Sequence, residues 1–143
     1  MTIRFDAKVA IVTGAGTGLG RSHALALAAR GARVVVNDLG GARDGTGGSV
    51  TAAQAVVEEI RAAGGEAMAN GANVAVFAEV QHMVEQTMSA WGRVDILVNN
   101  AGILRDKSFS KMALEDFHAV MDVHLFGAVH CTKAVWEIMR AQQ

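Results

Sequence analysis

The chain has 143 residues, about one domain's worth, and 51% of them are hydrophobic, so a globular fold with a buried core is expected. Its 13 basic and 14 acidic residues leave a net charge of −1, which gives no electrostatic basis for binding nucleic acid or an anionic membrane. Apolar runs are too short for a transmembrane helix, and the first residues lack the apolar region of a signal peptide. The single cysteine, Cys131, fits a reducing compartment, so we expect a cytoplasmic protein in which this thiol is packed in the core.

The first motif runs from Lys8 to Gly20 and reads KVAIVTGAGTGLG. The apolar run 9–12 predicts a strand buried on both faces, and the run 21–30 after the glycines predicts a helix that ends at Gly31. A strand, a glycine turn and a helix form the layout of a dinucleotide phosphate site. The helix N-terminus attracts the pyrophosphate there, and glycines let the backbone approach it.

A second strand, 33–37, is followed by Asp38. An acidic side chain at this strand end accepts hydrogen bonds from the adenosine ribose and repels a 2′-phosphate, so it favours NAD over NADP. Arg43 nearby would soften that preference. The alternative is that Asp38 only begins a turn before Gly40 and Gly41.

The glycine-dense segment 39–49 lacks the lysine motif of a phosphate loop, and we predict that it is a flexible connection. Ser49 is expected to cap a helix over 50–63. A short third strand over 66–70 and a helix over 78–91 follow, with Asn73 and Val74 between them.

A fourth strand, 94–99, runs into the sequence Asn99-Asn100-Ala101-Gly102. Ligands of open parallel sheets bind at the carboxyl ends of the strands, where the strand order reverses, so this tetrapeptide is a candidate cofactor loop. A simple Asx turn would explain one of the asparagines and not the whole tetrapeptide. Residues 114–141 predict one long helix whose apolar stripe is wide enough to face both the sheet and a partner helix.

The pattern TGxxxGxG at positions 13–20 resembles the fingerprint of the short-chain dehydrogenases. The stretches VVVNDLGG (34–41), VNNAGILRDKSF (98–109) and DVHLFG (122–127) resemble the (3R)-hydroxyacyl-CoA dehydrogenase modules of peroxisomal-type multifunctional enzyme 2 and its bacterial relatives. The resemblance implies an α/β fold with a Rossmann-type doubly wound parallel sheet in the order 3-2-1-4, truncated after the fourth strand and the long helix. Residues 1–143 would then be the NAD-binding part of one domain, which forms a homo-oligomer through the long helix.

The resemblance also implies the cofactor, the substrate class and the site. The cofactor would be NAD, and the substrate a 3-hydroxyacyl or 3-oxoacyl thioester such as an acyl-CoA. His124 stands where most members have a catalytic Asn whose backbone carbonyl holds a relay water, although a packed histidine is the alternative. The other histidines have no metal-ligand spacing, so no metal is expected. The cofactor-binding residues would be Gly14, Thr17, Gly18, Leu19, Gly20, Asp38, Asn73 (in the place of an Asp), Val74, Asn100, Ala101 and Gly102.

The family transfers a proton through a Tyr-x-x-x-Lys motif and orients its substrate with a Ser, but this sequence contains no tyrosine. Ser108 and Lys133 do not stand in those motifs, so the 143 residues alone are expected to be inactive. The unpaired edge of the fourth strand predicts self-association, aggregation or membership of a larger protein. A non-catalytic NAD-binding module and a 3-oxoacyl-ACP reductase remain alternatives. A phosphate-binding signalling domain is opposed by Asp38 and by the Asn99–Gly102 sequence.

Overall fold

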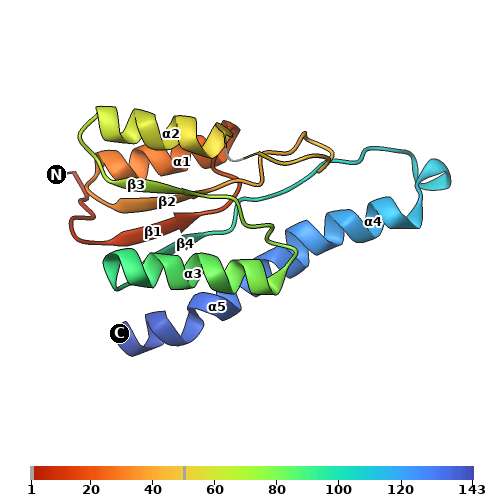
Figure 1. Cartoon of the computed structure of the whole chain (residues 1–143). Coiled ribbons are helices and arrows are strands. Elements are labelled where there is room, and N and C mark those ends of the chain that lie inside the picture. The colour runs from red at the N-terminus through yellow and green to blue at the C-terminus, as the bar shows by residue number, and fades with distance from the viewer. Residues whose placement is uncertain (1, 50) are drawn as a thin grey trace.

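The computed structural model describes residues 2–49 and 51–143 (Figure 1). The chain alternates strands and helices up to the fourth strand and then continues as one long helical run. In chain order the elements are β1 (Val9–Val12), α1 (Gly18–Ala29), β2 (Arg33–Asn37), α2 (Thr51–Ala62), β3 (Ala67–Asn70), α3 (Phe77–Trp91), β4 (Ile96–Val98), a 3₁₀ turn (Phe109–Lys111), α4 (Leu114–Met121), a π-helical segment (Asp122–Phe126) and α5 (Gly127–Gln142).

The four strands form one parallel sheet in the order β3-β2-β1-β4, which confirms the predicted Rossmann-type topology. Figure 1 shows α1 and α2 on one face of the sheet, with α3 and α5 on the other. Both faces are therefore covered, and this explains why β1 and most of β2 are continuous apolar runs instead of alternating ones. The predicted bounds of β1 and β2 are confirmed. β3 and β4 are shorter than the expected ranges 66–70 and 94–99.

The sheet separates two hydrophobic layers. Ala10, Val12 and Val34 point toward α1 and α2, whereas Ile11 and Val35 point toward α3 and α5. The second layer also contains Cys131, whose residue surface is 1% exposed. Burial raises the pKa of the Cys131 thiol to about 11, so it stays protonated at neutral pH, as expected of a packed core thiol.

The glycine-rich segment 39–49 is more ordered than the predicted flexible connection. The Ala42 N–H donates to the Thr46 carbonyl (2.9 Å), and the Ser49 N–H donates to the Leu39 carbonyl (2.7 Å), so the two arms of the segment pair with each other. The Ser49 hydroxyl accepts a hydrogen bond from the N–H of Thr51 at the start of α2, in agreement with its predicted capping role. The expected first helical residue, Val50, lies outside the described residues.

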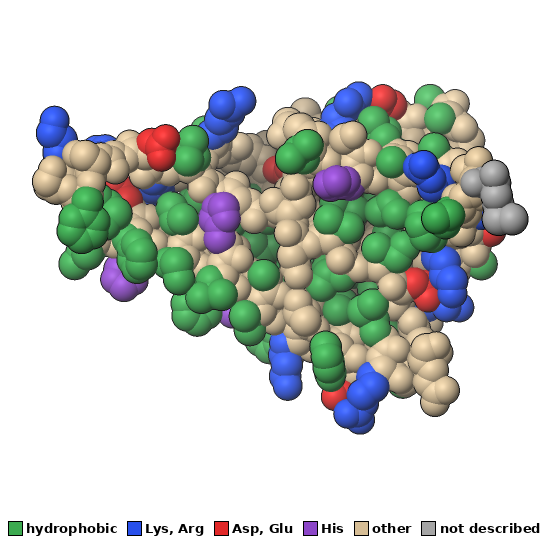
Figure 2. Space-filling model, turned by 180° about the vertical axis from the view of Figure 1, so that it is seen from behind, with side chains coloured by type: hydrophobic (Ala, Val, Ile, Leu, Met, Phe, Trp, Pro, Cys, Tyr) green, Lys and Arg blue, Asp and Glu red, His purple; other side chains and the backbone are tan. Residues whose placement is uncertain are grey.

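The prediction of a single α-helix over 114–141 is wrong in its middle. The backbone changes to a π-helix over Asp122–Phe126 and returns to an α-helix at Gly127. Within α5 only Gly127, Cys131 and Val135 are buried, and large apolar residues of the predicted stripe are exposed, among them Phe117, Leu125, Val129 and Trp136. Figure 2 shows hydrophobic side chains gathered along the arm that α4 and the π-helical segment form.

Candidate functional site

The turn after β1 brings the glycine backbone against the loop after β4. A Cβ atom on Gly14 would lie 2.8 Å from the Cα of Ala101, and one on Gly20 would lie 2.3 Å from the Gly14 carbonyl oxygen. Glycine is therefore required at both positions to let the start of α1 and the β4 loop come together.

The N-terminus of α1 is open to a ligand. Gly18 begins the helix with φ +56°, and no described heavy atom lies within 4 Å of the position where its Cβ would stand. The Thr17 side chain does not cap the helix. The first N–H groups of α1, at Gly18, Leu19 and Gly20, are thus available to an anion, and the helix dipole favours negative charge there.

Asp38 links the end of β2 to the glycine turn and to segment 39–49. Its Oδ2 accepts a hydrogen bond from the Gly16 N–H (2.8 Å), and its Oδ1 accepts one from the Gly40 N–H (2.7 Å). The two bonds fix the carboxylate plane, and each oxygen keeps a further lone pair for a ribose hydroxyl. The bond to Gly40 closes a turn directly after β2, as the alternative interpretation of Asp38 predicted. Asp38 therefore both closes this turn and lines the pocket.

Thr13 and Asn100 connect the glycine turn to the β4 loop. The Thr13 hydroxyl accepts from the N–H groups of Asn100 (3.1 Å) and Ala101 (3.0 Å). The Asn100 side-chain amide donates to the carbonyls of Thr13 (3.0 Å) and Gly14 (3.1 Å). The Asn100 side chain therefore joins the β4 loop to the glycine turn.

These segments surround a pocket of about 450 Å³ at the carboxyl ends of the strands. Its size falls in the range of small-molecule sites. Asn73 also closes a local turn through a 3.0 Å hydrogen bond from the Ala75 N–H to its Oδ1. Gly18, Leu19 and Gly20 are not part of the wall and begin α1 beside it. The predicted cofactor residues in the pocket wall are Gly14, Thr17, Asp38, Asn73, Val74, Asn100, Ala101 and Gly102.

His124 lies in the π-helical segment, and its ring reaches the β4 loop. The Nε2 atom is 3.0 Å from the Ile103 nitrogen and 2.9 Å from the Ile103 oxygen, so it accepts from the first or donates to the second according to its tautomer. A Cβ on Gly102 would come within 2.6 Å of the ring, so the glycine makes room for it. π-helical turns occur frequently at functional sites, and this one places Asp122 and Val123 in the pocket wall.

Other residues at the site carry no local sequence signal that separates them from structural residues. In the sequence Thr13 is only the residue that ends a strand, and the role of its hydroxyl becomes visible only with its partners at positions 100 and 101. Arg105 also lines the pocket; its Nε donates to the carbonyl of Asp44 (2.8 Å), and its Nη1 is 3.1 Å from the Asp116 Oδ1. These partners lie far along the chain, beyond any motif window.

Neither a metal-binding cluster nor a membrane-spanning helix is present in the described ranges, 2–49 and 51–143. No group of three or more His, Cys, Asp or Glu side chains there is placed to hold a metal ion. Among the same residues, no helix has the length and apolar character needed to cross a bilayer.

The chain is similar to several known proteins. The sequence model of the short chain dehydrogenase family matches residues 8–143. The peroxisomal multifunctional enzyme type 2 of Drosophila melanogaster is 55% identical over 140 residues, which cover 98% of this chain and 23% of that protein. A 3-oxoacyl-[acyl-carrier-protein] reductase of Synechocystis sp. is 50% identical over 137 residues, which cover 96% of this chain and 52% of the reductase.

The fold is also similar to that of solved dehydrogenase structures. The structure of a 7α-hydroxysteroid dehydrogenase in complex with NADH and a bile acid superposes with a TM-score of 0.87 at 36% sequence identity, covering 97% of this chain and 51% of that one. The chain thus spans between about a quarter and a half of the lengths of these relatives. Because the family match extends over nearly all of the sequence and the sheet order agrees with it, the chain belongs to the short-chain dehydrogenase family of oxidoreductases.

Proposed function

We propose that these residues are the NAD-binding part of a single Rossmann domain that transfers hydride between NAD and a 3-hydroxyacyl or 3-oxoacyl thioester. The observation that carries the proposal is the pocket in which the Asp38 carboxylate, the open N-terminus of α1 and the Asn100–Gly102 loop converge. A dinucleotide needs an anion site, a ribose acceptor and a close backbone approach; the N-terminus of α1 would supply the first, Asp38 the second and the Asn100–Gly102 loop the third. The NADH in the related hydroxysteroid dehydrogenase structure supports the choice of cofactor.

NAD fits the residues present. The N–H groups at Gly18 and Leu19 would hold the pyrophosphate, and Asp38 would accept from the adenosine ribose. Asn73 and Val74 would lie against the adenine, because they form the pocket wall on the β3 side. When bound, the nicotinamide supplies the hydride acceptor or donor. His124 is proposed to act at the nicotinamide side through its backbone carbonyl, where the π-helical turn interrupts the regular helix.

Binding of reduced cofactor tests the proposal. NADH is titrated into the wild-type chain and into Asp38→Asn, followed by cofactor fluorescence, and the titrations are repeated with NADPH. The wild type is expected to prefer NADH, and the variant to lose most of that preference, about tenfold, because one charge-assisted hydrogen bond and the repulsion of a 2′-phosphate disappear. No NADH binding by the wild type, or an unchanged preference in the variant, overturns the proposal.

Catalysis requires a proton carrier in addition to the cofactor. The sequence has no tyrosine, so the family's general acid–base is missing from these 143 residues, and we expect no turnover of NAD with a 3-hydroxyacyl-CoA. General acid–base assistance typically contributes about 10²–10⁴-fold, so its loss leaves a rate near background. Clear growth of NADH absorbance with the chain alone would contradict this expectation.

Two further candidates have an observation behind them. The Synechocystis relative favours a 3-oxoacyl-carrier reductase, but Asp38 opposes the NADP preference of many such enzymes. The cofactor pocket by itself also fits a non-catalytic NAD-binding module. Chemistry with a carrier-protein thioester identifies the first candidate, and NADH binding without turnover in the natural full-length protein identifies the second.

Assembly and location complete the proposal. The outward apolar face of α5 supports a homo-oligomer, with an acyl-CoA-like molecule as the small-molecule partner. A cytoplasmic location remains our proposal from the single buried cysteine, and the name of the Drosophila relative favours a peroxisomal location as the alternative. Fractionation of cells that express the natural protein decides between them.

A further inference from the structure

Segment 39–49 is folded as a closed loop attached to Asp38. Besides the pairing of its two arms, its Gly40 N–H donates to the Asp38 Oδ1 at 2.7 Å. The segment therefore cannot move as a whole without pulling on the carboxylate that faces the pocket.

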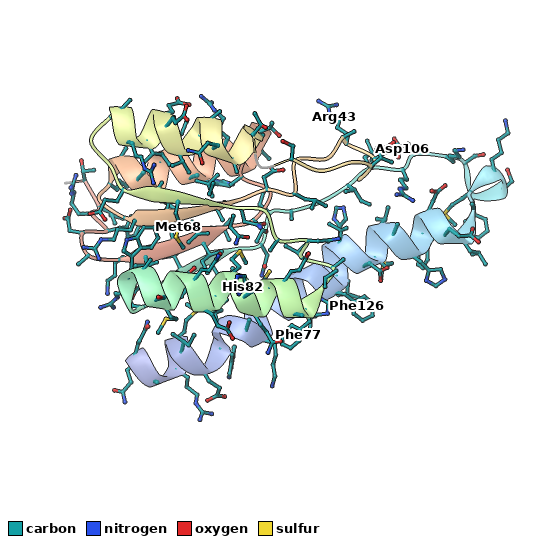
Figure 3. All side chains as sticks on the ribbon, viewed as in Figure 1. Arg43, Met68, Phe77, His82, Asp106 and Phe126 are labelled. Carbon is teal, nitrogen blue, oxygen red and sulfur yellow. The ribbon has the colours of Figure 1, made fainter. Side chains whose placement is uncertain are left out.

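The tip of this loop docks on the segment that follows the β4 loop. The Leu104 N–H donates to the Arg43 carbonyl at 2.7 Å, and the Arg105 Nε donates to the Asp44 carbonyl at 2.8 Å. The Ile103 side chain packs against Gly45, where an added Cβ would lie 3.0 Å from the Ile103 Cδ1. Figure 3 labels Arg43 and Asp106 on the two segments and shows the segments side by side.

Arg105 is itself held from the other side by α4. Its Nη1 lies 3.1 Å from the Asp116 Oδ1, and about a quarter of each of these two side chains is exposed. The guanidinium uses different nitrogens for its two partners, as its planar fork allows. One side chain thus connects segment 39–49 to a helix that begins on the far side of the pocket.

Arg105 and several residues of segment 39–49 line the same pocket as Asp38. They stand on the adenosine side of the proposed cofactor site, because that side is defined by Asp38 at the end of β2.

We propose that Arg105 is a positioning residue of the cofactor site: it holds segment 39–49 closed, and through the Gly40 bond it keeps the Asp38 carboxylate oriented toward the adenosine ribose. This inference rests on the proposed function. Without Arg105 the segment loses the hydrogen bond from the guanidinium to the Asp44 carbonyl, and Gly40 shifts. Asp38 then no longer discriminates between a ribose hydroxyl and a 2′-phosphate.

The charge of Arg105 and its proposed positioning role predict opposite changes in the preference for NADH when the side chain is removed. Loss of a positive charge at the pocket wall weakens NADPH more than NADH, and so raises the preference for NADH. Loss of the positioning role lowers that preference. A purely structural destabilisation weakens both cofactors to the same extent.

The experiment measures the dissociation constants of NADH and NADPH for the wild-type chain, Arg105→Met and Arg43→Met. Arg43 is the matched control, since it carries the same charge on the same pocket wall and its side chain points away from the molecule in Figure 3. Arg105→Met is expected to weaken NADH by about tenfold and to lower the ratio of the NADPH to the NADH constant at least roughly threefold. Arg43→Met is expected to leave that ratio unchanged or higher.

Arg105→Lys adds a second measurement. A single ammonium cannot reach both the Asp44 carbonyl and Asp116 in the geometry of the fork, so rescue is expected to be partial. If Arg105→Met fails to fold, as judged by urea unfolding without cofactor, Asp116→Ala replaces it, because that change removes the carboxylate that holds Arg105 from the side of α4 and so weakens its hold on the Asp44 carbonyl.

The outcomes separate the two proposals. If the wild type binds NADH but Arg105→Met, or Asp116→Ala in its place, keeps or raises the preference for NADH, the positioning role is wrong and the proposed function stands. If the wild type binds no NADH, the proposed function fails and this inference fails with it.

Discussion

The Asn100 side-chain amide donates to the main-chain carbonyl of Thr13 at 3.0 Å, and the Thr13 hydroxyl accepts from the Asn100 N–H at 3.1 Å. The two residues thus bind each other reciprocally across 87 positions of sequence. The same hydroxyl also donates to the Val98 carbonyl (3.3 Å) and accepts from the Ala101 N–H. One buried oxygen therefore joins the end of β1 to the end of β4, and this fixes the floor of the pocket.

Replacing Thr13 by Val tests this joint, because valine keeps the shape and removes the hydroxyl. The Ala101 N–H then loses its acceptor, and the Asn100 N–H keeps only its bond to the Val98 carbonyl (3.1 Å), so the free energy of unfolding is expected to fall by about 1–3 kcal/mol. Urea unfolding measures this change. Thr13→Ser keeps the hydroxyl and is the control; an equal loss in both variants would mean that the methyl group, and not the hydrogen bonds, matters.

Gly18 provides a test of the anion site at α1. Gly18 (φ +56°) and Gly64 (φ +88°) both have positive φ and open space at the Cβ position, but Gly18 begins α1 next to the pocket-wall residue Thr17, whereas Gly64 follows the end of α2. Alanine at either position is expected to lower the free energy of unfolding by about 1–2 kcal/mol. Only Gly18→Ala is expected to weaken NADH as well, by at least roughly tenfold, because its Cβ occupies the space in front of the helix N-terminus.

Calorimetric titration with NADH, paired with urea unfolding, distinguishes the two glycines. A matching drop in affinity for Gly64→Ala would show that the effect of Gly18→Ala arises from stability alone. That result would contradict the proposal that the cofactor's pyrophosphate binds at the N-terminus of α1.

The sequence predicted the sheet better than the loops, and the reason is physical. β1 and the middle of β2 are buried on both faces, so each reads as an apolar run with clear ends. The glycine turn and the place of Asp38 at the end of β2 were predictable as well, because a strand, a tight turn and a helix constrain the backbone within a short window. The strand order was implied by the resemblance to the short-chain dehydrogenases, and the sheet confirms it.

The order of segment 39–49 and the π-helical turn at 122–126 were not predictable in this way. The loop is held by backbone bonds and by Arg105, whose partner at Asp44 is 61 residues away, and neither leaves a periodic pattern. The π-helical turn coincides with the bond between His124 and Ile103 on another loop. In both places tertiary contacts decide a backbone for which local propensity gives no preference.

Asp95 predicts how stability depends on pH. Its carboxylate accepts from the Arg93 Nε (2.7 Å) and the Val9 N–H (2.9 Å), so it fixes the start of β1 against the start of β4. The hydrogen bond from Arg93 is the main cause that holds the pKa of Asp95 below its usual value. The folded pKa thus lies below the unfolded one. Ionised Asp95 stabilises the fold above about pH 4, and this contribution is lost as the pH falls through the lowered folded pKa.

Asp95→Asn is therefore expected to lower the free energy of unfolding at pH 7 by about 1.5–3 kcal/mol and to flatten the loss of stability below about pH 4. Urea midpoints measured between neutral and acid pH give both quantities. Asp6→Asn is the control: Asp6 also has a lowered pKa beside Arg4, but both side chains are mostly exposed, so little change is expected. Parallel pH profiles for wild type and Asp95→Asn would contradict this role.

The outward face of α5 predicts self-association. Leu125, Val129 and Trp136 line a groove of about 440 Å³, and Val129 and Trp136 are 54% and 56% exposed. In a two-fold dimer each substitution acts twice, and burial of a large apolar side chain contributes about 1.5–3 kcal/mol. Trp136→Glu is therefore expected to raise the dimer dissociation constant by at least about 100-fold in sedimentation velocity across a concentration series.

Ile3→Glu is the control, because Ile3 is 70% exposed and lies outside this groove, and it should leave the dimer dissociation constant unaltered. Equal association of the wild type and Trp136→Glu would move the interface away from α5, and the free edge of β4 would then be the next surface to substitute.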